Sequence, residues 1–205
     1  RAIYLDELRA PQLDVSVPQV GAPTLWSGGH DGSGYAVAVL DTGVDVTHPV
    51  FAGKTILEAC FSSSYPMLDV FSACPGGGTT EIGSGSAMPD TDLDGHYHGT
   101  HVASIAVGAA AGNVPNGVAP GADLLAVQVF TRFESSDDCG DSAPCTYAYD
   151  SDILEGLEWV YEQRDVIDVV AANLSLGGYP VAPGACSNTY TSVVALLDSV
   201  DIAVV

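Results

Sequence analysis

A chain of 205 residues is long enough for one domain with a substantial core, because a domain of this size removes about 70% of its unfolded surface from water. Its 5 basic and 26 acidic residues give a formal charge of −21, which repels phosphate backbones and excludes nucleic acid as a partner. A hydrophobic content of 47% argues against a disordered acidic tail. No apolar run approaches the ~20 residues that span a bilayer, so no membrane span is expected.

The first predicted element is a buried strand at 35–41, a nearly continuous apolar run that ends at a Thr-Gly turn. Similar runs predict further strands at 122–130, 166–176 and 201–205. Helical spacing is found between these runs at 99–111, 153–161 and 193–200. Alternating strands and helices predict right-handed βαβ units, and therefore an α/β fold with a doubly wound parallel sheet covered on both faces. Glycine-rich and acidic stretches at 76–85 and 134–143 predict flexible insertions.

Five cysteines lie in loop-like sequence, which indicates disulfides formed in an oxidising compartment, and hence secretion to an extracellular or periplasmic site. Loop closure favours pairing Cys60 with Cys74 and Cys139 with Cys145. This leaves Cys186 unpaired, which points to a partner outside the sequence.

Asp41 follows the first strand and precedes a glycine turn, so its carboxylate should emerge from the core. A desolvated carboxylate needs a partner. An isolated Asp-Thr-Gly is more often a turn aspartate bonded to backbone amides than a catalytic group. An aspartic protease would need two such carboxylates in one site, and the chain has one such motif.

Three histidines, His96, His98 and His101, lie within six residues at the start of a predicted helix. One imidazole there could take a proton from a nucleophile while a carboxylate holds its other nitrogen. The alternative is a zinc site, because His-x-His-x-x-His is a spacing that zinc can use. Thr100 stands where the metallohydrolase signature His-x-His-x-Asp-His has its aspartate, which weakens this alternative. Any one of these histidines taken alone is most simply a solvated or core residue.

Four motifs in the same order resemble the subtilase family of serine proteases: AVLDTGVDVTHP at 38–49, HGTHVA at 98–103, GVAPGA at 117–122 and NLSLGG at 173–178. The resemblance implies that Asp41 orients and stabilises an imidazolium, and that His98 is the general base and then the general acid. It gives His96 and His101 no catalytic role. It also implies that an extended peptide is bound between two backbone edges, with Leu176 lining an apolar pocket. These edges correspond to Ser175, Leu176 and Gly177 on one side and to Thr146, Tyr147, Ala148 and Tyr149 on the other.

The resemblance implies a three-layer subtilisin-like fold that is incomplete at its C-terminus. Residues 1–14 are expected to be a propeptide tail or linker, and 15–205 the N-terminal part of the peptidase domain. The family's Gly-Thr-Ser-Met-Ala nucleophile motif does not occur in the sequence. The chain alone is therefore expected to be inactive, with the C-terminal part of the same protease and its own propeptide as partners and a protein or peptide as substrate.

Two alternatives are also compatible with the sequence: a non-catalytic peptide-binding module on the same fold, and a zinc metallohydrolase that uses His96, His98 and His101. No cofactor is required by the serine mechanism. The resemblance implies a stabilising calcium ion, although the segment 108–118 is shorter than the loop that often holds it. No metal ligands are therefore assigned.

Overall fold

The computed structural model describes residues 13–177 and 189–205, and its centre is a six-stranded sheet. The strands in sheet order are β4 (Thr80–Ile82), β2 (Ile56–Phe61), β5 (Asp123–Gln128), β1 (Ala36–Asp41), β8 (Val169–Asn173) and β9 (Ala203–Val204). Neighbouring strands are parallel except for β4, which pairs antiparallel with β2. The parallel α/β sheet predicted from the sequence is thus present, with one antiparallel edge strand inside the glycine-rich segment expected to be an insertion.

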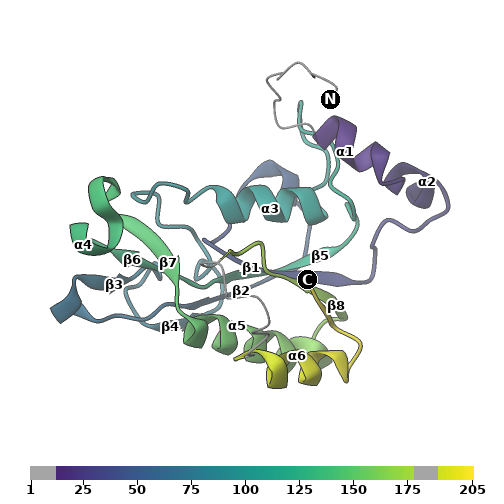
Figure 1. Ribbon diagram of the computed structural model, residues 1–205. Coiled ribbons are helices and arrows are strands. Elements are labelled where there is room, and N and C mark those ends of the chain that lie inside the picture. Colours follow the sequence, from purple (N-terminus) through teal and green to yellow (C-terminus); the bar gives the residue numbers. More distant parts are fainter. Residues whose placement is uncertain (1–12, 178–188) are drawn as a thin grey trace, which may run out of the picture.

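Helices cover both faces of this sheet and make the three layers that the sequence implied (Figure 1). One face carries α3 (His98–Val107), and the other carries α5 (Asp150–Glu162) and α6 (Thr191–Asp198). One apolar core lies between the sheet and α3, and the other lies between the sheet and the α5–α6 pair. β1 is buried on both sides, since its alternate residues belong to the two cores, and its carboxyl end lies in the middle of the molecule.

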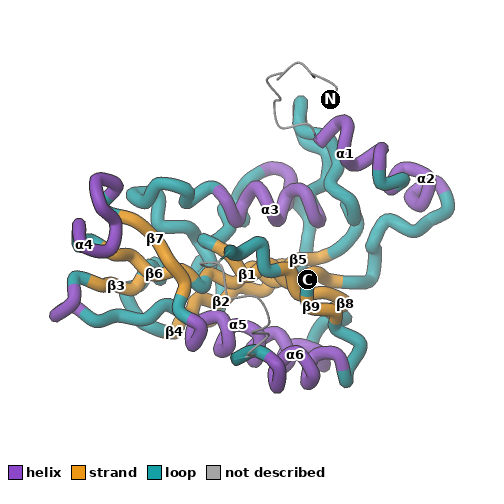
Figure 2. The backbone as a smooth tube through the Cα atoms, viewed as in Figure 1, coloured by secondary structure: helices purple, strands orange, loops and turns teal. Residues whose placement is uncertain are grey.

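A second sheet rises from the carboxyl ends of β2 and β5 and is antiparallel throughout (Figure 2). It consists of β3 (Val70–Ser72), β6 (Phe130–Phe133) and β7 (Cys145–Ala148), in that order. The run predicted as one strand at 122–130 is therefore divided at Val129 between β5 and β6. The short α4 (Ser136–Cys139) lies in the acidic segment between β6 and β7.

Two N-terminal helices, α1 (Leu13–Gln19) and α2 (Ala22–Ser27), precede the sheet and were not predicted. The Trp26 indole donates to the Val118 carbonyl over 2.9 Å and fastens α2 to the loop after α3. The predicted boundary at residue 14 falls inside α1, and Cys186 lies outside the described residues. Within the described ranges, no helix combines the length and apolar character needed to cross a membrane. Short 3-10 helices occupy Pro49–Phe51, Pro66–Leu68, Gly140–Ser142 and Gln163–Asp165.

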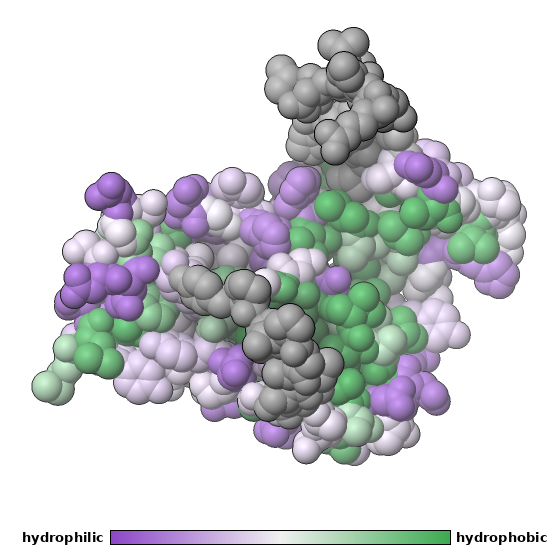
Figure 3. All heavy atoms as spheres, in the orientation of Figure 1, coloured by the Kyte–Doolittle hydropathy of each residue, from purple (hydrophilic) through white to green (hydrophobic). Residues whose placement is uncertain are grey.

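Hydrophobic residues are exposed on the face of the molecule near β8 and β9, while hydrophilic residues gather around α4 (Figure 3). β9 is the last strand of the larger sheet among the described residues, and Val205, which follows it, is 74% exposed. A surface cavity lies beside this edge strand and α6. Its lining is largely apolar and includes Val194, Ile202 and Val204.

Candidate active site

Asp41 ends the central strand β1 and is completely buried. Its Oδ1 accepts a hydrogen bond from the Thr42 backbone amide over 2.7 Å. In the sheet, Asp41 is in register with Gln128 of β5, and Val39 of the same strand is in register with Asn173 of β8. The carboxylate therefore stands between the two chain segments that continue from β5 and from β8.

His98 is the first residue of α3 and lies against this carboxylate, with Nδ1 2.8 Å from Oδ1 of Asp41. Because an ionised carboxylate only accepts hydrogen bonds, Nδ1 carries the proton, and Nε2 of the neutral ring is left with a free lone pair. The side chain of His98 is 48% exposed whereas that of Asp41 is inaccessible to solvent. The pair thus presents a basic nitrogen outward with a buried negative charge behind it, and the contact expected from the sequence is present.

The residues after each partner bring the two elements together. The Gly99 amide donates to Oγ1 of Thr42 over 3.0 Å, and that hydroxyl donates to the His96 carbonyl over 3.2 Å. A Cβ on Gly99 would lie 3.0 Å from the Cβ of Asp41 and would overlap the Gly43 carbonyl. Only glycine therefore lets the first turn of α3 approach β1 this closely, and neither Thr42 nor Gly99 was singled out from the sequence.

The second carboxylate oxygen of Asp41, Oδ2, is buried and has no hydrogen-bond partner among the described residues. A buried acceptor without a donor costs about 1–3 kcal/mol. An additional donor to this oxygen would therefore stabilise the site.

The other two histidines of the motif point elsewhere. Nδ1 of His96 donates to the Leu93 carbonyl over 2.7 Å. His96 and His101, together with His48, line a cavity of about 630 Å³ beside α3. No three His, Cys, Asp or Glu side chains are grouped to hold a metal ion in the described part of the chain. The zinc site of His96, His98 and His101 weighed from the sequence therefore has no support in the geometry.

The two segments expected to bind substrate come after β6 and after β8 in the chain. β7 is an edge strand of the smaller sheet, and it carries Thr146, Tyr147 and Ala148, with Tyr149 leading into α5. On the opposite side, Ser175 and Gly177 are exposed after β8, while Leu176 is half-buried against the α5–α6 core. The Asn173 amide donates to Oγ of Ser175 over 2.9 Å. The sheet order places these two segments on either side of the β1 end.

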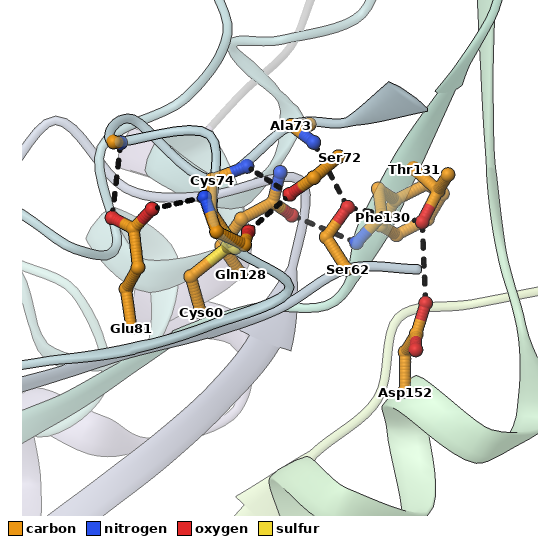
Figure 4. The surroundings of a disulfide bond; sticks show 12 residues. Cys60, Ser62, Ser72, Ala73, Cys74, Glu81, Gln128, Phe130, Thr131 and Asp152 are labelled. Atoms are coloured by element: carbon orange, nitrogen blue, oxygen red, sulfur yellow. Dashed lines mark hydrogen bonds between the residues drawn. A yellow bond between two sulfur atoms is a disulfide. The ribbon is translucent and has the colours of Figure 1, made fainter. Parts of the chain in front are cut away.

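Both cysteine pairs favoured by loop closure are formed: Cys60 with Cys74, and Cys139 with Cys145. The first joins the end of β2 to the residues after β3 and is buried next to a polar network (Figure 4). The second joins the last residue of α4 to the first residue of β7.

Arg132 of β6 holds the loop before His98 against the smaller sheet through an ion pair with Asp90. It donates to Asp90 over 3.2 Å and to Glu134 over 3.0 Å. Burial acts to lower the pKa of Arg132, but the hydrogen bonds to these two carboxylates outweigh it and raise the pKa overall. The guanidinium therefore stays charged and joins the smaller sheet to the approach of α3, a role that no sequence motif indicated.

Comparisons with known proteins agree with this geometry. The model of the subtilase family matches residues 32–201. Bacillopeptidase F of Bacillus subtilis (strain 168) is 35% identical over 154 residues, which are 75% of this chain and 9% of that protein. The major intracellular serine protease of the same organism is 30% identical over 168 residues, 82% of this chain and 41% of that protein. The chain spans less than half the length of either relative.

Among solved structures, a protease from Pseudoalteromonas arctica aligns with a TM-score of 0.65 at 24% identity, covering 90% of this chain and 52% of that chain. At this identity the likeness concerns the fold, and it agrees with the three-layer arrangement described above.

Proposed function

Because this chain belongs to the subtilase family, we propose that it forms the part of a serine endopeptidase that supplies the aspartate and the histidine of the catalytic triad. The observation that carries the proposal is the 2.8 Å contact between Nδ1 of His98 and Oδ1 of the buried Asp41. It leaves the exposed Nε2 basic, which is the arrangement that activates a serine hydroxyl.

In the proposed reaction, Nε2 of His98 takes the hydroxyl proton as the serine oxygen attacks the substrate carbonyl carbon. Asp41 stays ionised and stabilises the imidazolium. His98 then returns the proton to the leaving amine nitrogen as the peptide bond breaks. A water molecule repeats the sequence on the acyl-enzyme, so the proton count is restored after each turnover.

The serine is proposed to come from protein outside these 205 residues. The sequence lacks the family's nucleophile motif, and the matched relatives are more than twice as long as the part they share with this chain. The exposed apolar surface beside β9 suits a further segment of the same protein packing there. The 205-residue chain by itself should then be inactive.

The substrate is proposed to be a protein or peptide bound as an extended strand between β7 and the segment 175–177. Such strand addition takes affinity from main-chain hydrogen bonds and specificity from alternate side chains. Leu176, half-buried beside Ser175, would contribute an apolar wall. The two disulfides favour action in an oxidising compartment, hence secretion, although one relative is named as intracellular. A propeptide tail or linker at 1–14 and a structural calcium ion stay predictions.

A fluorophosphonate probe, which labels an activated serine, tests the proposal in the full-length protein. The wild type should be labelled, and His98→Ala and Asp41→Asn should slow labelling by about 10³-fold or more. His101→Ala is the matched control, because this histidine lies one turn along the same helix and should leave labelling unchanged. An unlabelled wild type, or equal loss in the His98 and His101 variants, would contradict the proposal.

A further inference from the structure

Asp152 is a buried carboxylate that the proposed triad does not use. It lies in the first turn of α5, three residues after Tyr149, and is 4% exposed. Three donors surround it: Ser63 N over 2.9 Å, Ser63 Oγ over 2.8 Å and Thr131 Oγ1 over 3.2 Å. All three are neutral groups, so hydrogen bonds and the positive end of the helix dipole stabilise its charge.

The hydrogen bonds behind Asp152 form a chain that passes through Thr131 and Ser62 (Figure 4). The Thr131 hydroxyl donates its only proton to the carboxylate. Ser62 Oγ must therefore be the donor in the 3.0 Å contact with Thr131 Oγ1. Ser62 Oγ in turn accepts from the Ala73 amide over 2.9 Å. The chain of donors from Ala73 through Ser62 and Thr131 therefore ends on Asp152, and the carboxylate fixes the orientation of every hydroxyl in it.

This network lies where the main chain leaves the large sheet to form the small one. Ser62 and Ser63 directly follow β2, and Ala73 precedes Cys74 of the buried disulfide. Thr131 belongs to β6 and is in register with Tyr147 on β7. Asp152 thus ties the disulfide-closed loop and β6 to the helix that continues directly from β7.

We propose that Asp152 is a positioning residue for the substrate-binding edge: it holds β7 at a fixed place relative to Asp41 and His98. This inference rests on the proposed function. β7 is an edge strand of its sheet, so its position depends on β6 and on α5. Asp152 links both of these supports. A fully satisfied buried network is rigid, whereas one that has lost its acceptor leaves donors unpaired and lets the elements shift.

The test compares two substrates in the full-length protease after active-site titration. One is an extended peptide that pairs with β7, and the other is p-nitrophenyl acetate, which is too small to reach it. Asp152→Asn should raise KM for the peptide about tenfold, as expected when a charge-assisted hydrogen bond is lost, with kcat within about twofold. Ester hydrolysis per titrated site should stay within about twofold of wild type.

Thr131 provides the second variant, in case Asp152→Asn does not fold. Thr131→Val removes one donor and should also raise the KM for the peptide. Thr131→Ser keeps a hydroxyl at this position and should therefore have a peptide KM close to that of the wild type. The matched control is Glu58→Gln on β2, a buried carboxylate that accepts from the Gly85 amide over 2.9 Å and lies outside this network. It should leave the peptide KM unchanged.

The outcomes separate this inference from the proposed function. If the network is merely structural, the Asp152 and Thr131 variants will contain fewer titratable sites but will show the wild-type peptide KM, and the inference is overturned. An equal rise in KM in Glu58→Gln would overturn it too. A wild-type protein that hydrolyses neither substrate would overturn the proposed function itself, and this inference with it.

Discussion

The Gly99 backbone amide donates to Oγ1 of Thr42 across 3.0 Å, so the residue after the aspartate holds the residue after the histidine. Asp41 and His98 are 57 residues apart in the chain, yet their immediate neighbours are bonded to one another. The 2.8 Å contact between carboxylate and imidazole therefore depends on a threonine and a glycine that carry no charge.

Thr42→Val should weaken this link while keeping the shape of the side chain. It removes the acceptor of the Gly99 amide and the donor to the His96 carbonyl, so the start of α3 can move away from β1. We expect kcat to fall about tenfold and the free energy of unfolding to fall by about 1–3 kcal/mol. Peptide hydrolysis by the full-length protease and urea unfolding measure the two effects.

Thr79→Val is the control for that substitution, because Thr79 is exposed and its side chain makes no hydrogen bond to another described residue. It should change neither quantity. If Thr42→Val kept wild-type kcat, the hydroxyl would have no part in placing His98.

Gly99→Ala should disturb the same approach by steric overlap. The new Cβ would stand 3.1 Å from Oδ1 of Asp41 and would clash with the Gly43 carbonyl. A displacement of about 1 Å between reacting groups lowers the rate on the order of 10²-fold. Stopped-flow or steady-state kcat per titrated site should show that loss. The control is Gly28→Ala at the end of α2, where φ is −89°, and it should keep the wild-type kcat.

The sequence predicted the elements whose signals are local. β1 and α3 carry apolar runs and motifs within a dozen residues, and the pairing of Asp41 with His98 was implied by the resemblance of these motifs to those of the subtilase family. β3 and β4 have three residues each, and their strand character comes from partners elsewhere in the chain, so no window of sequence indicates them.

The Asp152 network was not predicted, because its partners also lie far apart in the sequence. Its bonds join residues 89 and 69 positions apart, and Asp152 looks like an ordinary first-turn acidic residue of a helix. Arg132 is similar, because its partner Asp90 is 42 positions away in a loop without a recognisable pattern. Sequence patterns show which residues are near in the chain, whereas these contacts depend on how the two sheets are joined.

The Cys60–Cys74 disulfide should contribute more to stability than the Cys139–Cys145 disulfide. Its cysteines are 14 positions apart in the sequence, whereas Cys139 and Cys145 are 6 apart, so it closes the longer loop. Both of its cysteines are also buried, whereas those of the other pair are partly exposed. Replacing Cys60 and Cys74 by serine should lower the free energy of unfolding by about 3 kcal/mol or more, since loop entropy alone accounts for about that much and buried hydroxyls add to it.

The double serine variant of Cys139 and Cys145 serves as the comparison, with a loss of about 2 kcal/mol expected. Guanidinium unfolding of the two variants and the wild type measures both differences. Equal losses would contradict the prediction, because loop closure alone should make the first loss larger by about 1 kcal/mol.

Alkaline pH should destabilise the protein through Tyr190. Burial first, and then the hydrogen bond that its hydroxyl donates to Asp150, raise the pKa of Tyr190 above its ordinary value of 10.0. The folded protein keeps this proton at a pH where the unfolded chain releases it. The contribution to stability is therefore complete below about pH 10 and is lost as pH rises above that value, at up to about 1.4 kcal/mol per pH unit.

Tyr190→Phe removes the titrating hydroxyl and should flatten the fall in unfolding free energy between pH 10 and pH 11. Asp150→Asn should flatten it in part, because burial still raises the pKa of Tyr190 when the charge is gone. Urea unfolding at pH 9, 10 and 11 measures the slope for each protein. A slope in Tyr190→Phe as steep as in the wild type would assign the alkaline loss to other groups, since a phenylalanine has no proton to release.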